Sequence, residues 1–276
     1  MRSVTRAPVL PSAGAALPPY VRTAFGVGEA EPRPVVWAGR RVWLCGDVLI
    51  RPVPDNVVAA WSATVLDALQ VQGLRVARPV RSSDGRWVVG GWAACWYVPG
   101  LLEPRYDAVI DAAMRLHAAT ATVARPRMRD GSDDLLTRSA AGAFGERRLQ
   151  LNPALGGDLY ARLAELRRPI RLVPQVVHPE LFGAMLFDHD GVPALIEMVP
   201  CWRPKEWAAA VIVVDALAWG GAESALLHRW SHLDEWPQAL LRALLHRLAL
   251  HAQHPDASDR TLAGLQRAAT LVGALF

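Results

Sequence analysis

The sequence is poor in the residues from which disulfide frameworks and zinc sites are built. Its 276 residues include three cysteines, Cys45, Cys95 and Cys201, which are far apart, odd in number and without CxxC spacing. A disulfide framework needs paired cysteines and a structural zinc site needs closely spaced ligands, so both are disfavoured. Each cysteine lies in an apolar stretch, where a free thiol behaves as a small buried hydrophobe. We therefore expect a reducing, cytoplasmic location.

Lysine is nearly absent as well, because Lys205 is the single lysine of the chain and arginine supplies the other basic side chains. Thirty basic and twenty-six acidic residues leave a net charge of +4 with histidine neutral. The two signs are mixed along the chain rather than gathered in a basic stripe, so we expect no nucleic-acid partner.

Long apolar runs are also missing. The closest to a membrane span, residues 207–219 (WAAAVIVVDALAW), is too short and carries Asp215. Prolines at positions 8, 11, 18 and 19 interrupt the N-terminal stretch, which does not fit a secretory signal. We expect no membrane partner and interpret residues 1–17 as a disordered leader. The sequence does not indicate an oligomeric state.

What the sequence has is apolar material for a core, since 52% of its residues are hydrophobic. Strand patterns bounded by turn residues predict strands at 35–37, 41–44, 48–53, 76–81 and 86–98. Asp55 is a predicted N-cap for a helix over 57–72, ended by Gly73, with Val57, Trp61, Val65 and Leu69 toward the core. Residues 18–100 therefore form a predicted β-rich unit with one helix.

Helical periodicity dominates from residue 101 onward. Helices are predicted at 106–122, 154–167, 207–219, 222–230, 236–253 and 259–274. In the helix at 236–253, leucines form one face while Arg242 and His246 lie on the opposite, solvated face. A strand at 172–177 and a hairpin of 184–187 with 192–198 interrupt the helices, and Asp188 and Asp190 form its turn beside Gly191.

The segment 177–198 concentrates the polar residues on which a chemical function would depend. It reads VHPELFGAMLF, DHDG and VPALIEM, and places His178 and Glu180 after a strand and Glu197 at the end of the hairpin. This order resembles the aminoglycoside phosphotransferase family, in which His-Gly-Asp-Leu follows a strand and a metal-binding Asp ends the next hairpin. VLIRPV, MRLHAATA and the stretch ending WYVPG resemble other parts of that family in the same order, over roughly residues 20–250.

The resemblance implies an α+β, two-lobed protein-kinase-like fold, with an N-lobe at 18–100 and a C-lobe at 101–276. It also implies ATP and Mg²⁺ as cofactors and a nucleotide and a hydroxylated small molecule as partners. Glu180 stands at the position of the catalytic base, Arg51 at that of the phosphate-binding lysine, and Glu197 at that of the metal ligand. His178 and Asp215 stand at positions that support the site.

Several residues depart from the family motif. Pro179 replaces Gly, Glu180 and Glu197 replace Asp, and Ala184 and Met185 occupy the place of the loop Asn. Glu carries the same carboxylate on a stem longer by about 1.5 Å, and a misplacement of about 1 Å costs on the order of a hundredfold in rate. The departures therefore preserve negative charge and alter the geometry that Mg²⁺ requires.

Each candidate residue also has a structural interpretation. Glu197 lies in an apolar strand and needs a partner, either a metal or a basic group such as Arg51. Asp215 is expected to accept backbone N–H groups of the loop 178–181. Three functions remain open: an ATP-dependent small-molecule kinase, a pseudokinase that binds a ligand without transfer, and a scaffold that binds no nucleotide.

Overall fold

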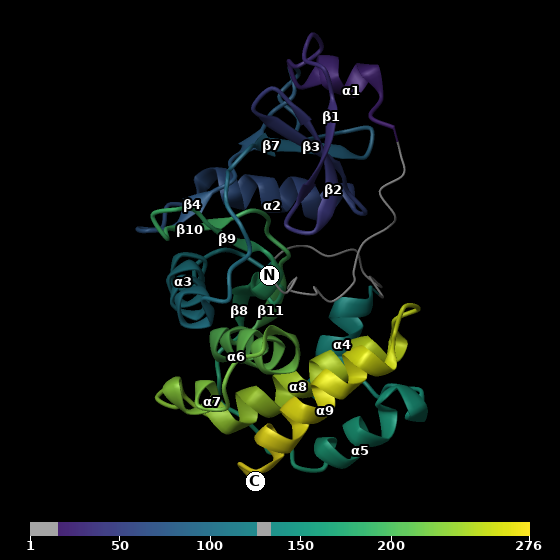
Figure 1. Cartoon of the computed structure of the whole chain (residues 1–276), viewed down its shortest axis with the longest axis vertical. Coiled ribbons are helices and arrows are strands. Elements are labelled where there is room, and N and C mark those ends of the chain that lie inside the picture. Colours follow the sequence, from purple (N-terminus) through teal and green to yellow (C-terminus); the bar gives the residue numbers. More distant parts are fainter. Residues whose placement is uncertain (1–15, 126–133) are drawn as a thin grey trace.

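The computed structural model describes residues 16–125 and 134–276, and these residues form an α+β fold with a sheet at one end and helices at the other (Figure 1). The predicted fold class is confirmed. Residues 1–15 of the predicted leader lie outside the described residues. At the other end of the predicted leader, Leu17 is 8% exposed and packs into a core cluster of the sheet, so the prediction of disorder is wrong for this residue.

The sheet is antiparallel and six-stranded. Its strands are β1 (Arg33–Trp37), β2 (Arg40–Cys45), β3 (Val48–Pro52), β5 (Pro79–Val80), β6 (Val88–Val89) and β7 (Trp92–Trp96). The order is β1-β2-β3-β7-β5, with β6 also paired to β7. The helix α2 (Asn56–Ala68) lies along the lower part of this sheet in Figure 1, and the short helix α1 (Pro19–Ala24), which the sequence did not predict, lies at its far end.

Two predicted strands of this region are each divided in two. The predicted strand 86–98 turns at Gly90 and Gly91, whose φ values of 56° and 81° suit glycine, so that β6 folds back on β7. The predicted strand 76–81 becomes β4 (Arg75–Val76) and β5, which belong to different sheets. Periodicity alone does not distinguish one long strand from two that change partners.

Helix α2 begins as predicted, with the Asp55 carboxylate accepting the N–H groups of Val57 and Val58. It ends four residues earlier than predicted, because the guanidinium of Arg78 donates to the carbonyl oxygens of Leu66, Asp67 and Leu69. The predicted apolar face is confirmed for Leu69, which belongs to the main core cluster, and for Trp61 and Val65, which pack against it. Val57 is the exception, because it is 48% exposed.

A small second sheet joins the two ends of the molecule. Strand β4 pairs in parallel with β10 (Pro193–Leu195), which pairs with β9 (Met185–Phe187) of the predicted hairpin. The segment after β7 is fastened to the same hairpin, since Leu101 and Phe187 exchange two backbone hydrogen bonds of 2.9 Å. The predicted boundary between lobes at residue 100 remains a prediction, and this connection fixes how the hairpin lies against the sheet.

The remaining described elements form the helical end. They are α3 (Tyr106–Ala119), α4 (Leu135–Ala143), α5 (Gly157–Ala164), β8 (Gln175–Val177), β11 (Cys201–Arg203), α6 (Lys205–Asp215), α7 (Leu226–Arg229), α8 (Trp236–Gln253) and α9 (Asp259–Gly273). Helix α6 lies at the centre, packed against α8 and α3, and residues 206–215 are all buried. Apolar residues all around a helix predict such burial.

Helix α8 is buried on both faces, and the prediction that Arg242 and His246 face solvent is wrong. Arg242 is 4% exposed and His246 is fully buried, with its ring 5.2 Å from that of Trp207. Helices α4, α5 and α9 cover the faces of α8 that α6 leaves open, so amphipathic periodicity could not show the burial. Trp207 and Trp236 belong to the main core cluster, and Trp202, Trp219 and Trp230 pack against it.

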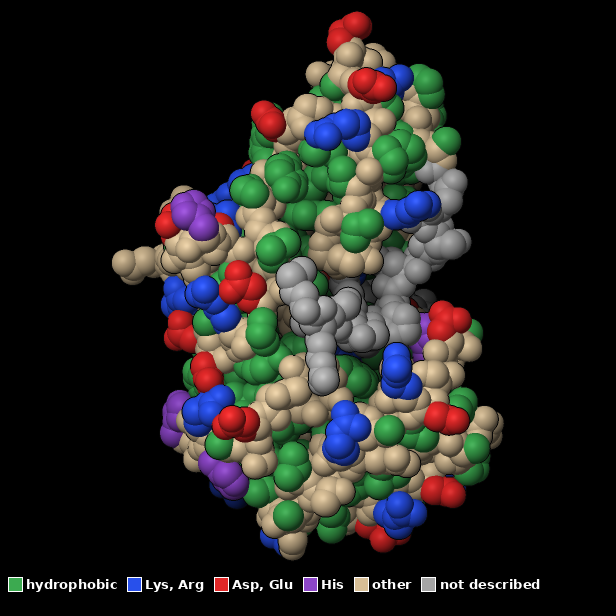
Figure 2. Space-filling model, in the orientation of Figure 1, with side chains coloured by type: hydrophobic (Ala, Val, Ile, Leu, Met, Phe, Trp, Pro, Cys, Tyr) green, Lys and Arg blue, Asp and Glu red, His purple; other side chains and the backbone are tan. Residues whose placement is uncertain are grey.

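The surface and the helices agree with two sequence observations. Every described helix is too short or too polar to span a bilayer. Figure 2 shows acidic and basic side chains interspersed on the face in view, with hydrophobic side chains between them over the sheet. The cysteines carry no disulfide.

Candidate functional site

His178 follows β8 and lies at the centre of a buried hydrogen-bond network. Its Nδ1 accepts the backbone N–H of Glu180 at 3.0 Å, which leaves Nε2–H to donate to the carbonyl oxygen of Glu197 at 3.1 Å. The ring thereby joins the loop after β8 to the strand that ends at Glu197. The supporting role of His178 in a functional site stays a prediction.

A second histidine, His117 of α3, supports the first. Its Nε2 accepts the backbone N–H of His178 at 3.1 Å, and its side chain is fully buried. Burial lowers the pKa of His117 to about 3, assisted by the nearby His178 and Lys205. His117 is therefore neutral at physiological pH, which its role as a hydrogen-bond acceptor requires.

Glu180 and Asp215 share one buried cation, Arg247 of α8. Arg247 Nη1 donates to Glu180 Oε1 at 2.5 Å, while Nε and Nη2 donate to the two oxygens of Asp215 at 2.6 and 2.5 Å. The side chain of Arg247 is 1% exposed. Arg247 therefore neutralises the carboxylate predicted to act as a base and fixes its orientation.

The prediction that Asp215 accepts N–H groups of the loop 178–181 is wrong, because its oxygens are bound by Arg247. The link to the loop is indirect, since Arg247 Nη2 also approaches the carbonyl oxygen of Pro179 at 3.4 Å. Burial raises the pKa of Asp215 to about 6, against the lowering effect of Arg247. The two carboxylates raise the pKa of Arg247 against its burial, so it stays charged.

Glu197 is buried and pairs with Arg40, which lies at the start of β2 just after the β1–β2 turn. Of the interpretations left open for Glu197, the ion pair is present, and its partner is Arg40 rather than Arg51. The pair brings the β1–β2 turn onto the end of the hairpin. It also occupies the carboxylate that the family resemblance assigned to a metal.

Arg51 is not part of this network. It lies in β3 opposite Ala93 and is half-buried, and its side chain has no hydrogen bond or ion pair among the described residues. Its charge and that of Glu197 act on Cys95 in opposite directions, while burial raises the pKa of that thiol to about 11. The side chains of Arg51 and Glu197 make no hydrogen bond or ion pair with each other.

The residues present do not fit a Mg²⁺ site. Within the described ranges, no three His, Cys, Asp or Glu side chains gather in one place, so a Mg²⁺ ion would depend on one or two carboxylates. Glu180 and Glu197 are each engaged by a guanidinium, and the positions of the loop Asn hold Ala184 and Met185. Asp188, as predicted, forms the hairpin turn by accepting the N–H groups of Asp190 and Val192. Its second oxygen pairs with Arg75 at 3.1 Å.

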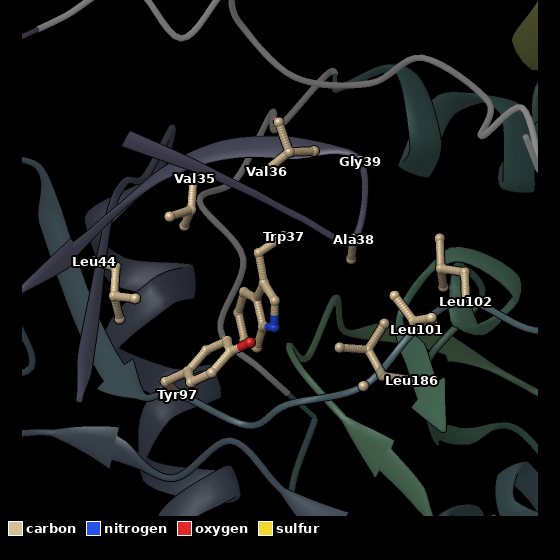
Figure 3. A pocket seen from close by; sticks show the side chains of 11 residues that line it. Val35, Val36, Trp37, Ala38, Gly39, Leu44, Tyr97, Leu101, Leu102 and Leu186 are labelled. Carbon is tan, nitrogen blue, oxygen red and sulfur yellow. The ribbon is translucent and has the colours of Figure 1, made fainter. Parts of the chain in front are cut away.

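A cavity of about 310 Å³ lies beside the segment that follows β7. Figure 3 shows its walls, which come from the β1–β2 hairpin, from residues 97–102 and from the strand β9. The lining residues are Val35, Val36, Trp37, Ala38, Gly39, Leu44, Tyr97, Gly100, Leu101, Leu102 and Leu186. None of them carries a charge, so the cavity suits an apolar or flat molecule better than a phosphate group.

Trp37 fills part of this space. Its indole points from the end of β1 toward Tyr97, the first residue after β7 (Figure 3). Its Nε1 donates to the backbone carbonyl oxygen of Val98 at 3.2 Å. Trp37 is buried, and it occupies the acceptor that a planar ligand entering here would meet.

The structure therefore joins four of the five predicted site residues and leaves Arg51 apart. Sequence reasoning missed Arg40, His117 and Arg247. A charged residue inside the apolar run LLHRLAL was a signal for Arg247, because a buried charge requires a partner. Arg40 follows an ordinary turn and had no such signal.

No protein-family model and no curated protein sequence matches this chain. Among solved structures it is similar to a microcompartment-associated aminopropanol kinase, with TM-score 0.54, 15% identity and coverage of 92% of this chain and 94% of that chain. It is also similar to a thermostable mutant of aminoglycoside phosphotransferase APH(4)-Ia in a ternary complex with AMP-PNP and hygromycin B (0.55, 12%, 88% and 93%). A third is the choline kinase LicA from Streptococcus pneumoniae (0.51, 12%, 85% and 89%).

These three similarities extend over nearly the whole length of both chains, and their low identities restrict the conclusion to architecture. The expected fold is confirmed: this chain has the kinase-like fold of small-molecule phosphotransferases.

Proposed function

We propose that this protein is a pseudokinase, which uses a kinase-like fold to bind a small ligand and does not transfer a phosphoryl group. The observation that carries the proposal is the pairing of both candidate carboxylates with arginine. Glu180 is held by Arg247 and Glu197 by Arg40, and both carboxylates are buried.

Phosphoryl transfer in this fold depends on carboxylates that position Mg²⁺ and accept the proton of the substrate hydroxyl. A carboxylate whose lone pairs are engaged by a guanidinium is less available to accept a substrate proton or to bind a metal ion. Releasing Glu180 would leave Arg247 with Asp215 alone in the core. Arg40 lies nearer the surface, with a side chain 19% exposed, so Glu197 is the easier of the two to free.

The uncharged cavity supports ligand binding rather than transfer. Its volume of about 310 Å³ is at the lower end of typical ligand sites, and its lining matches a flat, mostly apolar molecule. A nucleoside or another planar ring fits this chemistry. The triphosphate of ATP would need cations, and the nearest arginine along the lining, Arg40, is engaged with Glu197.

The alternative is the ATP-dependent kinase of a hydroxylated small molecule, with Glu180 as base, Arg51 on phosphate and Glu197 on Mg²⁺. The fold and the unpaired Arg51 favour it. Two measurements separate the functions: thermal shift with ATP, ADP and adenosine, each with and without Mg²⁺, and ATP turnover with Mg²⁺. We expect no turnover and no effect of Mg²⁺ on the shift.

The matched variants are Glu180→Gln in the buried triad and Glu223→Gln, an exposed residue of the helical end. Magnesium-dependent ATP turnover that Glu180→Gln abolishes and Glu223→Gln preserves would establish the kinase and overturn the proposal. If none of the three nucleotides or nucleosides shifts the transition at millimolar concentration, the scaffold interpretation replaces both.

A further inference from the structure

A second cavity, of about 520 Å³, lies in the helical end and is lined by charged residues. Its walls are formed by Arg171 and the chain leading to β8, by Lys205 and Glu206 at the start of α6, and by Asp234 and Glu235 just before α8. This volume is well within the range of small-molecule sites. Its charged lining distinguishes it from the apolar cavity beside Trp37.

The cavity is remote from the Glu180–Arg247–Asp215 triad. Helix α6 begins at Lys205 and reaches Asp215 ten residues later, a rise of about 15 Å. Helix α8 begins at Trp236 and reaches Arg247 eleven residues later, a rise of about 17 Å. The cavity lies at the beginning of both helices, and the triad residues Asp215 and Arg247 lie about 15 Å or more farther along them. An occupant of this cavity would therefore not touch the triad.

Glu206 is the residue that most needs an occupant. Glu206 is 6% exposed and lines the cavity, yet its side chain has no hydrogen-bond or ion-pair partner anywhere in residues 16–125 and 134–276. Its place in the first turn of α6 gives it some stabilisation from the helix dipole. The carboxylate thus borders the cavity without a bound counter-charge, and a cation in the cavity would supply one.

The surrounding charges favour a cation. Three carboxylates line the cavity, from Glu206, Asp234 and Glu235, against two basic groups. Arg171 is exposed and its side chain is free to turn to solvent, whereas Glu206 is fixed in the buried first turn of α6. The wall is held in place, because the backbone N–H of Arg171 donates to Glu235 Oε1 at 2.6 Å.

The occupant is an organic cation rather than a metal ion. The carboxylates of the cavity are not among any metal-binding group of three or more His, Cys, Asp or Glu in the described part of the chain. Carboxylates spread around a volume of this size suit a molecule with separated nitrogen atoms. We infer that this cavity binds a small organic amine, whose ammonium group pairs with Glu206 while Asp234 and Glu235 attract the rest of its charge.

The test is isothermal titration of the full chain with 1,4-diaminobutane and with spermidine, at constant ionic strength. The uncharged 1,4-butanediol and calcium chloride serve as control titrants. Glu206→Gln removes the charge with little change of shape, and Glu223→Gln removes a charge from an exposed residue outside the cavity. We expect Glu206→Gln to weaken amine binding by about tenfold or more, while Glu223→Gln changes it by less than about twofold.

Amine binding that Glu206→Gln leaves unchanged would overturn the inference and make Glu206 a structural carboxylate. No binding of either amine at about 10 mM, or binding of calcium alone, would also overturn it. If Glu206→Gln does not fold, the exposed Asp234→Asn replaces it, with a smaller loss of affinity expected and an unchanged affinity as the contrary result. The test does not depend on the cavity beside Trp37, so either proposal can fail without the other.

Discussion

Replacing Arg247 by methionine tests whether a single buried guanidinium holds the two carboxylates in the core. Its side chain is 1% exposed and donates to Glu180 and Asp215 over distances of 2.5–2.6 Å. Methionine fills similar space and leaves both carboxylates without a counter-charge. Breaking a buried ion pair from one side costs about 3–5 kcal/mol, and here two pairs are broken. We expect the free energy of unfolding to fall by at least about 3 kcal/mol, a large share of the 5–15 kcal/mol typical of a protein.

Neutralising the carboxylates should reverse part of that loss. Glu180→Gln alone leaves the Arg247–Asp215 pair intact, so it should cost about 1.5–3 kcal/mol, the value of one hydrogen bond to a charged group. The triple variant Arg247→Met, Glu180→Gln and Asp215→Asn contains no buried charge at these positions. We expect it to be more stable than Arg247→Met by about 1 kcal/mol or more, because neighbours in one network are not additive.

Urea unfolding followed by tryptophan fluorescence measures these differences, with the slope against urea as a check on two-state behaviour. Arg260→Met is the control, since Arg260 is exposed on α9 and its loss should stay within about 0.5 kcal/mol. A loss of less than about 1 kcal/mol in Arg247→Met would refute the reasoning. So would a triple variant whose stability equals the sum of the three single changes.

Three further predictions follow from single contacts. Trp37→Phe removes the N–H that donates to the Val98 carbonyl oxygen, so the free energy of unfolding should fall by about 1 kcal/mol. The same change frees this carbonyl oxygen for a ligand, so titration calorimetry should show tighter binding of adenosine. Burial lowers the pKa of His117 to about 3, so between about pH 3 and 6.5 the unfolded chain binds more protons than the native state. His117 therefore makes the free energy of unfolding fall as the pH decreases through this range, by up to about 1.4 kcal/mol per pH unit. Asp215, with its pKa raised to about 6, acts in the opposite direction between its unfolded value of 3.8 and 6. Urea unfolding between pH 7 and 5 should therefore show a shallower loss in His117→Gln, and an unchanged slope would remove His117 as the cause. Gly91→Ala should cost about 1 kcal/mol by the same assay, because φ is 81° and no atom obstructs the added methyl group, whereas no loss would show that the turn relaxes.

The elements that could be predicted are those whose signal lies within a few neighbouring residues. The hairpin of β2 and β3, the cap of α2 by Asp55 and the turn at Asp188 all follow from adjacent side chains and backbone. The clustering of His178, Glu180 and Glu197 follows from a motif of twenty residues. The end of α2 did not follow, because Arg78 reaches back to cap it from a separate strand.

The arginines of the site were unpredictable for the same reason, on a larger scale. Arg40 precedes Glu197 by 157 residues, and Arg247 follows Glu180 by 67. An apolar surrounding shows that a carboxylate needs a partner but not which of thirty basic residues provides it. The sequence thus indicated that Glu197 needs a partner, either a metal or a basic group, and the folded chain supplies a basic group, Arg40, that no local pattern distinguished.

The longer carboxylates and the arginines form one arrangement. Relative to aspartate, glutamate at positions 180 and 197 carries its charge about 1.5 Å farther from the backbone. At position 180 the longer side chain brings the carboxylate within 2.5 Å of Arg247 in α8. The carboxylate of an aspartate would lie about 1.5 Å farther from Arg247, which is beyond hydrogen-bond distance. At position 197 it meets Arg40 from the opposite end of the molecule. Under the proposed function, the same change of length that moves a carboxylate away from the position of a metal ligand also permits the ion pair, so both effects have one physical cause.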